Sequence, residues 1–131
     1  MEDTVIVIML KDEQGILDKE LGVYKILQND DVLVNIHAVA SQEGLLICAK
    51  ISTGRDVEDW EFSPIYDHYD TGVFGDEIKQ IKEVDDCFNP TWELMFDLID
   101  RTSAMEEKLN RILAIHKQEL QDVYVMIKES V

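Results

Sequence analysis

Short polar turns divide the first fifty residues into apolar segments. Residues 5–10 are apolar on both faces, which predicts a central strand, and in the later segments apolar side chains recur at about every second position. A period of two is expected of β-strands with one buried face. The polar connections are about four residues long, which favours antiparallel neighbours because parallel strands need a crossover of a dozen residues or more. The second segment is predicted to be broken near Gly22. The four predicted strands cover residues 5–10, 16–28, 32–40 and 45–51.

The alternation also assigns side chains to the two faces of the predicted sheet. In the third segment, Asn35 and His37 point away from an apolar row. That row consists of Val32, Val34, Ile36 and Ala38, and the fourth segment contributes Leu45, Ile47, Ala49 and Ile51. Residues 1–53 are therefore predicted to form a four-stranded antiparallel β-meander with one apolar face.

Residues 54–88 mix acidic and aromatic side chains and are predicted to form an acidic connector with short helices. The serine–proline pair at 63–64 is typical of an N-cap followed by proline in the first helical turn, so residues 64–71 are either a short helix or an ordered loop. The Gly-Asp-Glu sequence at 75–77 is predicted to open a second helix. Its apolar stripe would consist of Ile78, Ile81 and Val84.

Residues 89–131 carry the strongest helix signal. Asn89 and Pro90 supply an N-cap and a first-turn proline, and neither glycine nor proline follows. Apolar residues occupy most positions of a heptad count that begins at Trp92, with polar interruptions at Thr102, Glu106 and His116. This stripe predicts either a long core helix lying across the sheet or an oligomer seam.

The length of this helix bears on oligomerisation. A continuous helix over 90–129 would be about 60 Å long, whereas a chain of this size has a radius of gyration of roughly 14 Å. The helix either breaks near Ser103, where Ser103 and Glu106 match a capping box, or continues and buries its overhang against a second chain. We favour a homo-oligomer, with a dimer preferred. The predicted interface residues are Trp92, Ile99, Leu109, Leu113, Leu120, Val123 and Ile127.

The sequence therefore predicts one α+β domain over residues 1–131, with helices on one face of the meander. Its formal net charge is −16, from 28 acids and 12 bases, and residues 54–90 contribute 11 acids and 3 bases. Such a charge repels nucleic acid and anionic membranes and attracts basic partners, although acidity also serves simply to keep a small protein soluble. We expect no nucleic-acid or membrane partner and consider a basic protein partner.

The cysteines and the N-terminus bear on localisation. Cys48 and Cys87 show no disulfide-framework spacing, so both are predicted to be free thiols in a reducing compartment. The chain starts without a basic n-region, and its longest apolar run, 5–10, is too short to span a bilayer. These features together predict a cytoplasmic protein.

Candidate catalytic chemistry is confined to Asp67, His68 and Asp70, which could present carboxylates and an imidazole to a divalent cation. On a helix the two aspartates would share a face, but His68 would point about 100° away. There is no second ligand pair with metal spacing, so no cofactor is expected. His116, on an apolar stripe, is interpreted as a hydrogen-bonded core residue.

The favoured function is that of a non-enzymatic acidic interaction or adaptor protein that self-associates through its C-terminal helix. In size and acidity alone the chain is similar to the small acidic chaperones that escort secreted proteins in bacteria, although those usually begin with a helix and this chain begins with a predicted strand. The alternative is a small metal-dependent hydrolase that uses Asp67, His68 and Asp70.

Overall fold

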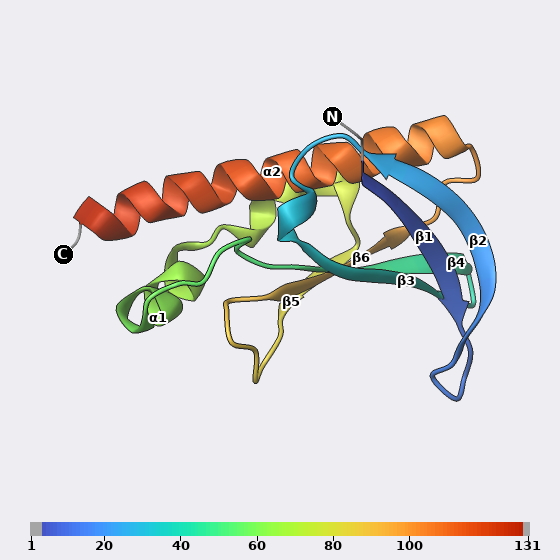
Figure 1. Cartoon of the computed structure of the whole chain (residues 1–131), viewed down its shortest axis with the longest axis horizontal. Helices are drawn as coiled ribbons and strands as arrows, with labels where there is room; N and C mark the ends of the chain where they lie inside the picture. The colour runs from blue at the N-terminus through green and yellow to red at the C-terminus, as the bar shows by residue number, and fades with distance from the viewer. Residues whose placement is uncertain (1–3, 130–131) are drawn as a thin grey trace.

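A computed structural model describes residues 4–129 of the chain. It is an α+β protein with a mixed six-stranded sheet in the order β2-β1-β3-β4-β6-β5, and the long C-terminal helix lies along one face (Figure 1). The strands are β1 (Thr4–Lys11), β2 (Leu17–Ile26), β3 (Leu33–Ser41), β4 (Gly44–Ile51), β5 (Gln80–Glu83) and β6 (Trp92–Asp97). The helices are α1 (Asp59–His68) and α2 (Thr102–Glu129), and the 3-10 helices are η1 (Asp30–Val32) and η2 (Thr71–Glu77).

All four strands predicted in the first half are present, but they do not form a simple meander. The strands β1 and β2 form one antiparallel hairpin, and β3 and β4 form another. The prediction was wrong about the connection between the hairpins, because β3 pairs parallel with β1 through Leu10↔Ala38 and Lys11↔Val39. The strand β2 together with η1 supplies the long crossover that a parallel pair requires.

The predicted break near Gly22 is a register irregularity in the β1–β2 hairpin. Ile8 is paired with Gly22, but the next residue, Met9, is paired with Glu20, so Leu21 is an extra residue on β2. A side chain at Gly22 would place its Cβ 2.5 Å from the Tyr24 hydroxyl. Glycine therefore lets the Tyr24 ring, which is 4% exposed, lie over the irregular part of the strand.

The core lies between the sheet and α2. The predicted inward positions Ile47, Ala49 and Ile51 are buried, which confirms the face assignment for β4. Val34 was assigned to the same face but is 56% exposed, because the register of β3 against β4 shifts between Leu33 and Asn35. The buried residues of α2 follow one helical stripe that includes Met105, Leu109, Ile112, Leu113, Leu120, Val123 and Ile127.

The prediction of a helix beginning at Asn89–Pro90 was wrong. Residues Trp92–Asp97 form β6, in which Trp92, Leu94 and Phe96 alternate into the core with at most 1% exposure. The helix predicted after residues 75–77 is also wrong, since β5 pairs antiparallel with β6 at this point. The helix α2 starts at Thr102, beside the Ser103–Glu106 pattern, and its 28 residues extend about 42 Å along the sheet and α1 (Figure 1).

This corrected boundary removes the length argument for a partner chain. Six of the seven residues predicted to form the oligomer interface are 0–3% exposed within the single chain, and Ile99 is partly buried. Trp92 comes from β6, and the others of the six come from the inward stripe of α2. These side chains contact the chain's own core, so the heptad pattern reflects packing of α2 against its sheet.

The helix α1 begins five residues earlier than the serine–proline pair predicted. Glu58 is its N-cap, and the side chains of Glu58 and Glu61 form a reciprocal capping box with each other's backbone N–H groups. Pro64 lies inside the helix. The first turn is stabilised by two glutamates, because carboxylates accept hydrogen bonds from the free N–H groups of a helix start.

Candidate functional site

The residues predicted as weak metal ligands do not form a site. Asp67 and His68 are exposed in the last turn of α1, and Asp70 caps η2 by accepting a hydrogen bond from the Gly72 N–H at 2.9 Å. Across residues 4–129, no three histidine, cysteine, aspartate or glutamate side chains gather in a way that could hold a metal ion. Asp67, His68 and Asp70 are therefore not gathered as metal ligands within these residues.

His116 is fully buried and is held at both ring nitrogens. Nε2 lies 2.6 Å from the Ser52 carbonyl oxygen, and Nδ1 lies 2.7 Å from the Tyr69 hydroxyl. A carbonyl can only accept, so Nε2 carries the proton and Nδ1 accepts from Tyr69. Desolvation lowers the pKa of His116 to about 4. Both ring nitrogens are already engaged, so His116 joins α2 to the loop after β4 and to the end of α1 as a structural residue.

The aromatic rings around His116 complete this buried contact. Tyr69 stacks on Trp92 with ring centroids 4.3 Å apart, and Trp92 meets the His116 ring edge-on at 5.5 Å. Burial also raises the pKa of the Tyr69 hydroxyl, so Tyr69 stays a neutral donor to His116. This arrangement confirms the interpretation of His116 as a hydrogen-bonded core residue.

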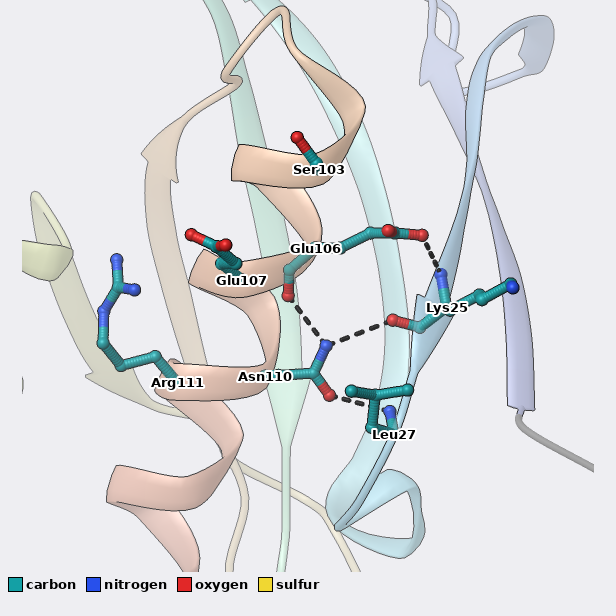
Figure 2. A pocket seen from close by; sticks show the side chains of 7 residues that line it. All are labelled: Lys25, Leu27, Ser103, Glu106, Glu107, Asn110 and Arg111. Atoms are coloured by element: carbon teal, nitrogen blue, oxygen red, sulfur yellow. Dashed lines mark hydrogen bonds between the residues drawn. The ribbon is translucent and has the colours of Figure 1, made fainter. Parts of the chain in front are cut away.

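A groove of about 510 Å³ lies between the edge strand β2 and the first half of α2 (Figure 2). Here α2 side chains bond the free backbone edge of β2. Glu106 accepts from the Lys25 N–H at 2.7 Å, and Asn110 accepts from the Leu27 N–H at 2.8 Å while donating to the Lys25 carbonyl at 3.1 Å. Helix side chains thus satisfy three backbone groups at the C-terminal end of the β2 edge, where a neighbouring strand would otherwise bond.

The acid-rich segments of the chain form one end of the molecule. Val57 donates its N–H to the Asn89 side chain at 3.0 Å, and Asn89 in turn donates to Asp56 at 3.1 Å. Tyr66 of α1 accepts from the Thr91 N–H at 2.8 Å. These bonds hold α1 and the loop before it against the connection between β5 and β6. We call these two segments, residues 54–68 and 84–91, the acidic end.

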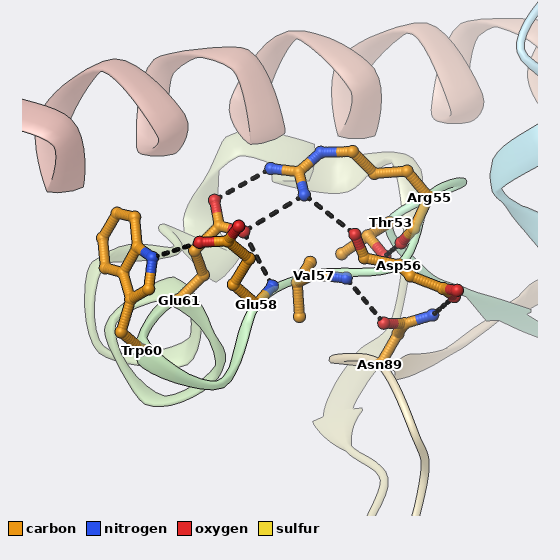
Figure 3. A network of polar contacts seen from close by, with 8 residues as sticks. All are labelled: Thr53, Arg55, Asp56, Val57, Glu58, Trp60, Glu61 and Asn89. Carbon is orange, nitrogen blue, oxygen red and sulfur yellow. Dashed lines mark hydrogen bonds and ion pairs between the residues drawn. The ribbon is translucent and has the colours of Figure 1, made fainter.

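A charged network organises the acidic end (Figure 3). Arg55 makes a two-pronged contact with Glu61, at 3.2 and 2.9 Å, and its guanidinium lies 4.4 Å from the centre of the Tyr124 ring. The Arg55 hydrogen bond lowers the pKa of the Glu61 carboxyl. The Trp60 indole donates to Glu58 at 2.6 Å. Arg55 is therefore paired with Glu61 within the fold, and Lys128 at the end of α2 lines the same cavity as Arg55, Trp60 and Glu61.

The outer surface of the acidic end combines negative charge with large aromatic side chains. Trp60 is 46% exposed and Phe88 is 79% exposed. The exposed carboxylates are Asp56, Glu58, Asp59, Asp67, Asp85 and Asp86. The sequence indicated the excess of acids here but not this arrangement, because the bonds between the two segments come from Asn89 and Tyr66. The Glu58–Glu61 spacing was the one local signal that could have located the helix start.

The geometry describes an α+β domain whose sheet is covered on one face by a C-terminal helix and whose acidic end exposes aromatic side chains. The chain belongs to the family of unknown function DUF6762, whose model matches residues 1–131. No curated protein and no solved structure matches it. Within residues 4–129, no helix is long and apolar enough to cross a membrane.

Proposed function

We propose that this protein is a non-enzymatic interaction protein that binds a basic protein partner at its acidic end. The observation that carries the proposal is the exposure of Phe88 and Trp60 among exposed carboxylates. Aromatic side chains are enriched at protein interfaces, and an isolated exposed phenylalanine beside Asp85 and Asp86 has no role in the core. A partner with arginine or lysine around an apolar pocket would complement both features.

The charge of the whole chain supports the same choice of partner. With a formal net charge of −16, the protein attracts a basic partner over a distance of about one Debye length, roughly 8–10 Å in physiological salt. Binding to a second copy would bring two such charges together. Self-association through α2 is not needed for this proposal, since its apolar stripe is already covered by the sheet.

A synthetic peptide with alternating arginine and leucine residues is a suitable probe, and fluorescence anisotropy measures its binding to the full chain. We expect Phe88→Ala to weaken binding by about fivefold or more, because it removes an exposed anchor without touching the core. The double variant Asp85→Asn with Asp86→Asn should also weaken binding. Its matched control is Asp18→Asn with Glu20→Gln on β2. This variant also removes two negative charges, but from the edge of the sheet opposite β5.

The comparison between the two charge variants decides the proposal. Equal losses of affinity would mean that the peptide responds to net charge alone, and the acidic end would not be the binding site. Unchanged binding by Phe88→Ala would remove the aromatic anchor from the proposal. A larger loss at the acidic end than at β2, together with a loss at Phe88, supports it.

A further inference from the structure

The sheet has a second face, which points away from α2. Ala38, Ile47 and Leu94 point into the core, so the residues that alternate with them point to the opposite side. The helix α2 lies along the core face (Figure 1). On the opposite face, the middle of the sheet carries His37 from β3 and Cys48 from β4.

Three potential metal ligands are direct neighbours across this face. His37 is paired with Cys48 in the β3–β4 register, and Cys48 is paired with Met95 in the β4–β6 register. Side chains paired in this way have Cβ atoms roughly 4.5–5.5 Å apart. Met9 extends the row, because the adjacent pair Leu10↔Ala38 places it beside His37 on the parallel neighbour β1. An imidazole, a thiol and two thioethers therefore lie in one line across four strands.

The burial of these residues fits a shared site. Cys48 is only 6% exposed although it lies on the face away from α2, whereas Met9, His37 and Met95 are each partly exposed. The shortest side chain lies in the middle, and the longer His37 and Met95 flank it on both sides. An ion bound by the Cys48 sulfur would thus have an imidazole on one side and a thioether on the other, and metal–sulfur and metal–nitrogen bonds are about 2.0–2.3 Å long.

We infer that His37, Cys48 and Met95 form a binding site for one Cu(I) ion, with Met9 as a further thioether donor. Thiolate and thioether sulfur are soft ligands that favour Cu(I), and imidazole also suits copper. The inference is independent of the acidic end and of any basic partner. Binding forms a bond between Cu(I) and the Cys48 sulfur, and the thiol proton goes to water. Copper stays in the +1 state, so no oxidant or reductant is consumed.

The charges on this face favour a monovalent ion. Lys11 and Lys50 lie on the same side of the sheet as the row, next to Val39 and Asn35 in the register. Glu93, which is paired with Lys50 on this side, is held in an ion pair with Lys82 at 3.4 Å. Cu(I) bound to one thiolate carries no net charge, so it does not repel these lysines. Zn(II) on the same single thiolate would keep a positive charge, and it favours imidazole, thiolate and carboxylate over thioether. The site should therefore discriminate between the two metals.

Competition with the chromophoric Cu(I) chelator bicinchoninate, under anaerobic reducing conditions, tests the inference on the full chain. We expect the wild-type protein to withdraw one equivalent of Cu(I). Cys48→Ser and Met95→Leu should each weaken binding by at least about tenfold, since losing a ligand costs no less than losing a residue that only orients one. Met95→Leu conserves volume and so keeps the fold. The matched control is Cys87→Ser, because Cys87 is the other free thiol and lies in the acidic end.

The variants make each result informative. Retention of Cu(I) by Cys87→Ser, with loss in both Cys48→Ser and Met95→Leu, supports the site. Failure of the wild type to compete overturns it, and so does loss of binding in Cys87→Ser alone. Wild-type affinity in Met95→Leu would also overturn it, because the cysteine would then bind without the row. Equal affinity for Zn(II) in a parallel competition would contradict the assignment to Cu(I).

Discussion

Acidification should destabilise this protein through His116, and the effect can be calculated. The pKa of His116 is lowered from 6.5 to about 4 because the ring is buried and desolvated. Between these two values the unfolded chain binds a proton that the folded chain does not. The free energy of unfolding therefore falls as the pH drops through 6.5, and the loss levels off below 4. With 1.36 kcal/mol per pKa unit, His116 removes about 2 kcal/mol at pH 5 and about 3 kcal/mol at pH 4.

Other buried groups contribute in the same pH range and must be separated from His116. Burial raises the pKa of Glu119, so the folded chain binds that proton more readily than the unfolded chain, and acidification acts there in the stabilising direction. Glu61 acts in the opposite way, because its hydrogen bond to Arg55 lowers its pKa and its protonation at low pH is destabilising. A variant of His116 keeps both carboxyls, so the difference from wild type isolates the imidazole.

Urea unfolding at pH 7 and pH 5, followed by circular dichroism, measures the effect. His116→Gln retains one donor for Ser52 and one acceptor for Tyr69 but does not titrate. We expect the wild type to lose about 2 kcal/mol more than this variant between the two pH values. His68→Gln is the matched control, because His68 is exposed at the end of α1, and it should behave as wild type. Equal pH dependence in wild type and His116→Gln would refute the reasoning.

Three further results follow from the packing. Leu120→Ala should lower the free energy of unfolding by about 2–5 kcal/mol, and the exposed Val125→Ala by less than about 0.5 kcal/mol. The urea midpoint of the wild type should not depend on protein concentration, because the apolar stripe of α2 is buried within one chain. Asn110→Ala should cost about 1–2 kcal/mol in urea unfolding, since it leaves the Lys25 carbonyl of β2 and the N–H of the following Leu27 without their side-chain partner. Arg55→Met should raise the pKa of Glu61, measured by NMR titration, because burial remains when the guanidinium is gone.

The first half of the fold could be predicted because its signals are local. A continuous apolar run located β1, alternation and short turns located β2 to β4, and the glycine at position 22 marked the irregular register. The order of strands could not be predicted, since both a meander and the observed arrangement bury the same apolar rows. The choice depends on contacts distant in sequence. The bonds from Glu106 and Asn110 to the edge of β2 satisfy the backbone that β3 would otherwise pair with.

The C-terminal prediction failed because two periods overlap in the same residues. Trp92 and Met95 fit a heptad, but Trp92, Leu94 and Phe96 fit a strand. The strand forms because residues 92–97 pair with β4 in the sheet. A six-residue alternation is too short to outweigh a longer helical pattern that follows without glycine or proline. The polar interruptions were informative in hindsight, because Thr102 begins α2 and His116 and Glu106 bond other elements.

The negative charge around Phe88 opposes self-association through this exposed side chain. An aromatic side chain that is 79% exposed would invite association between copies of the same protein. Asp85 and Asp86 adjoin it in sequence, so two copies that met at Phe88 would bring like charges together, and the net charge of −16 would oppose their approach. A basic partner meets no such barrier. Under the proposed function, the same carboxylates oppose a second copy and attract the basic partner at Phe88.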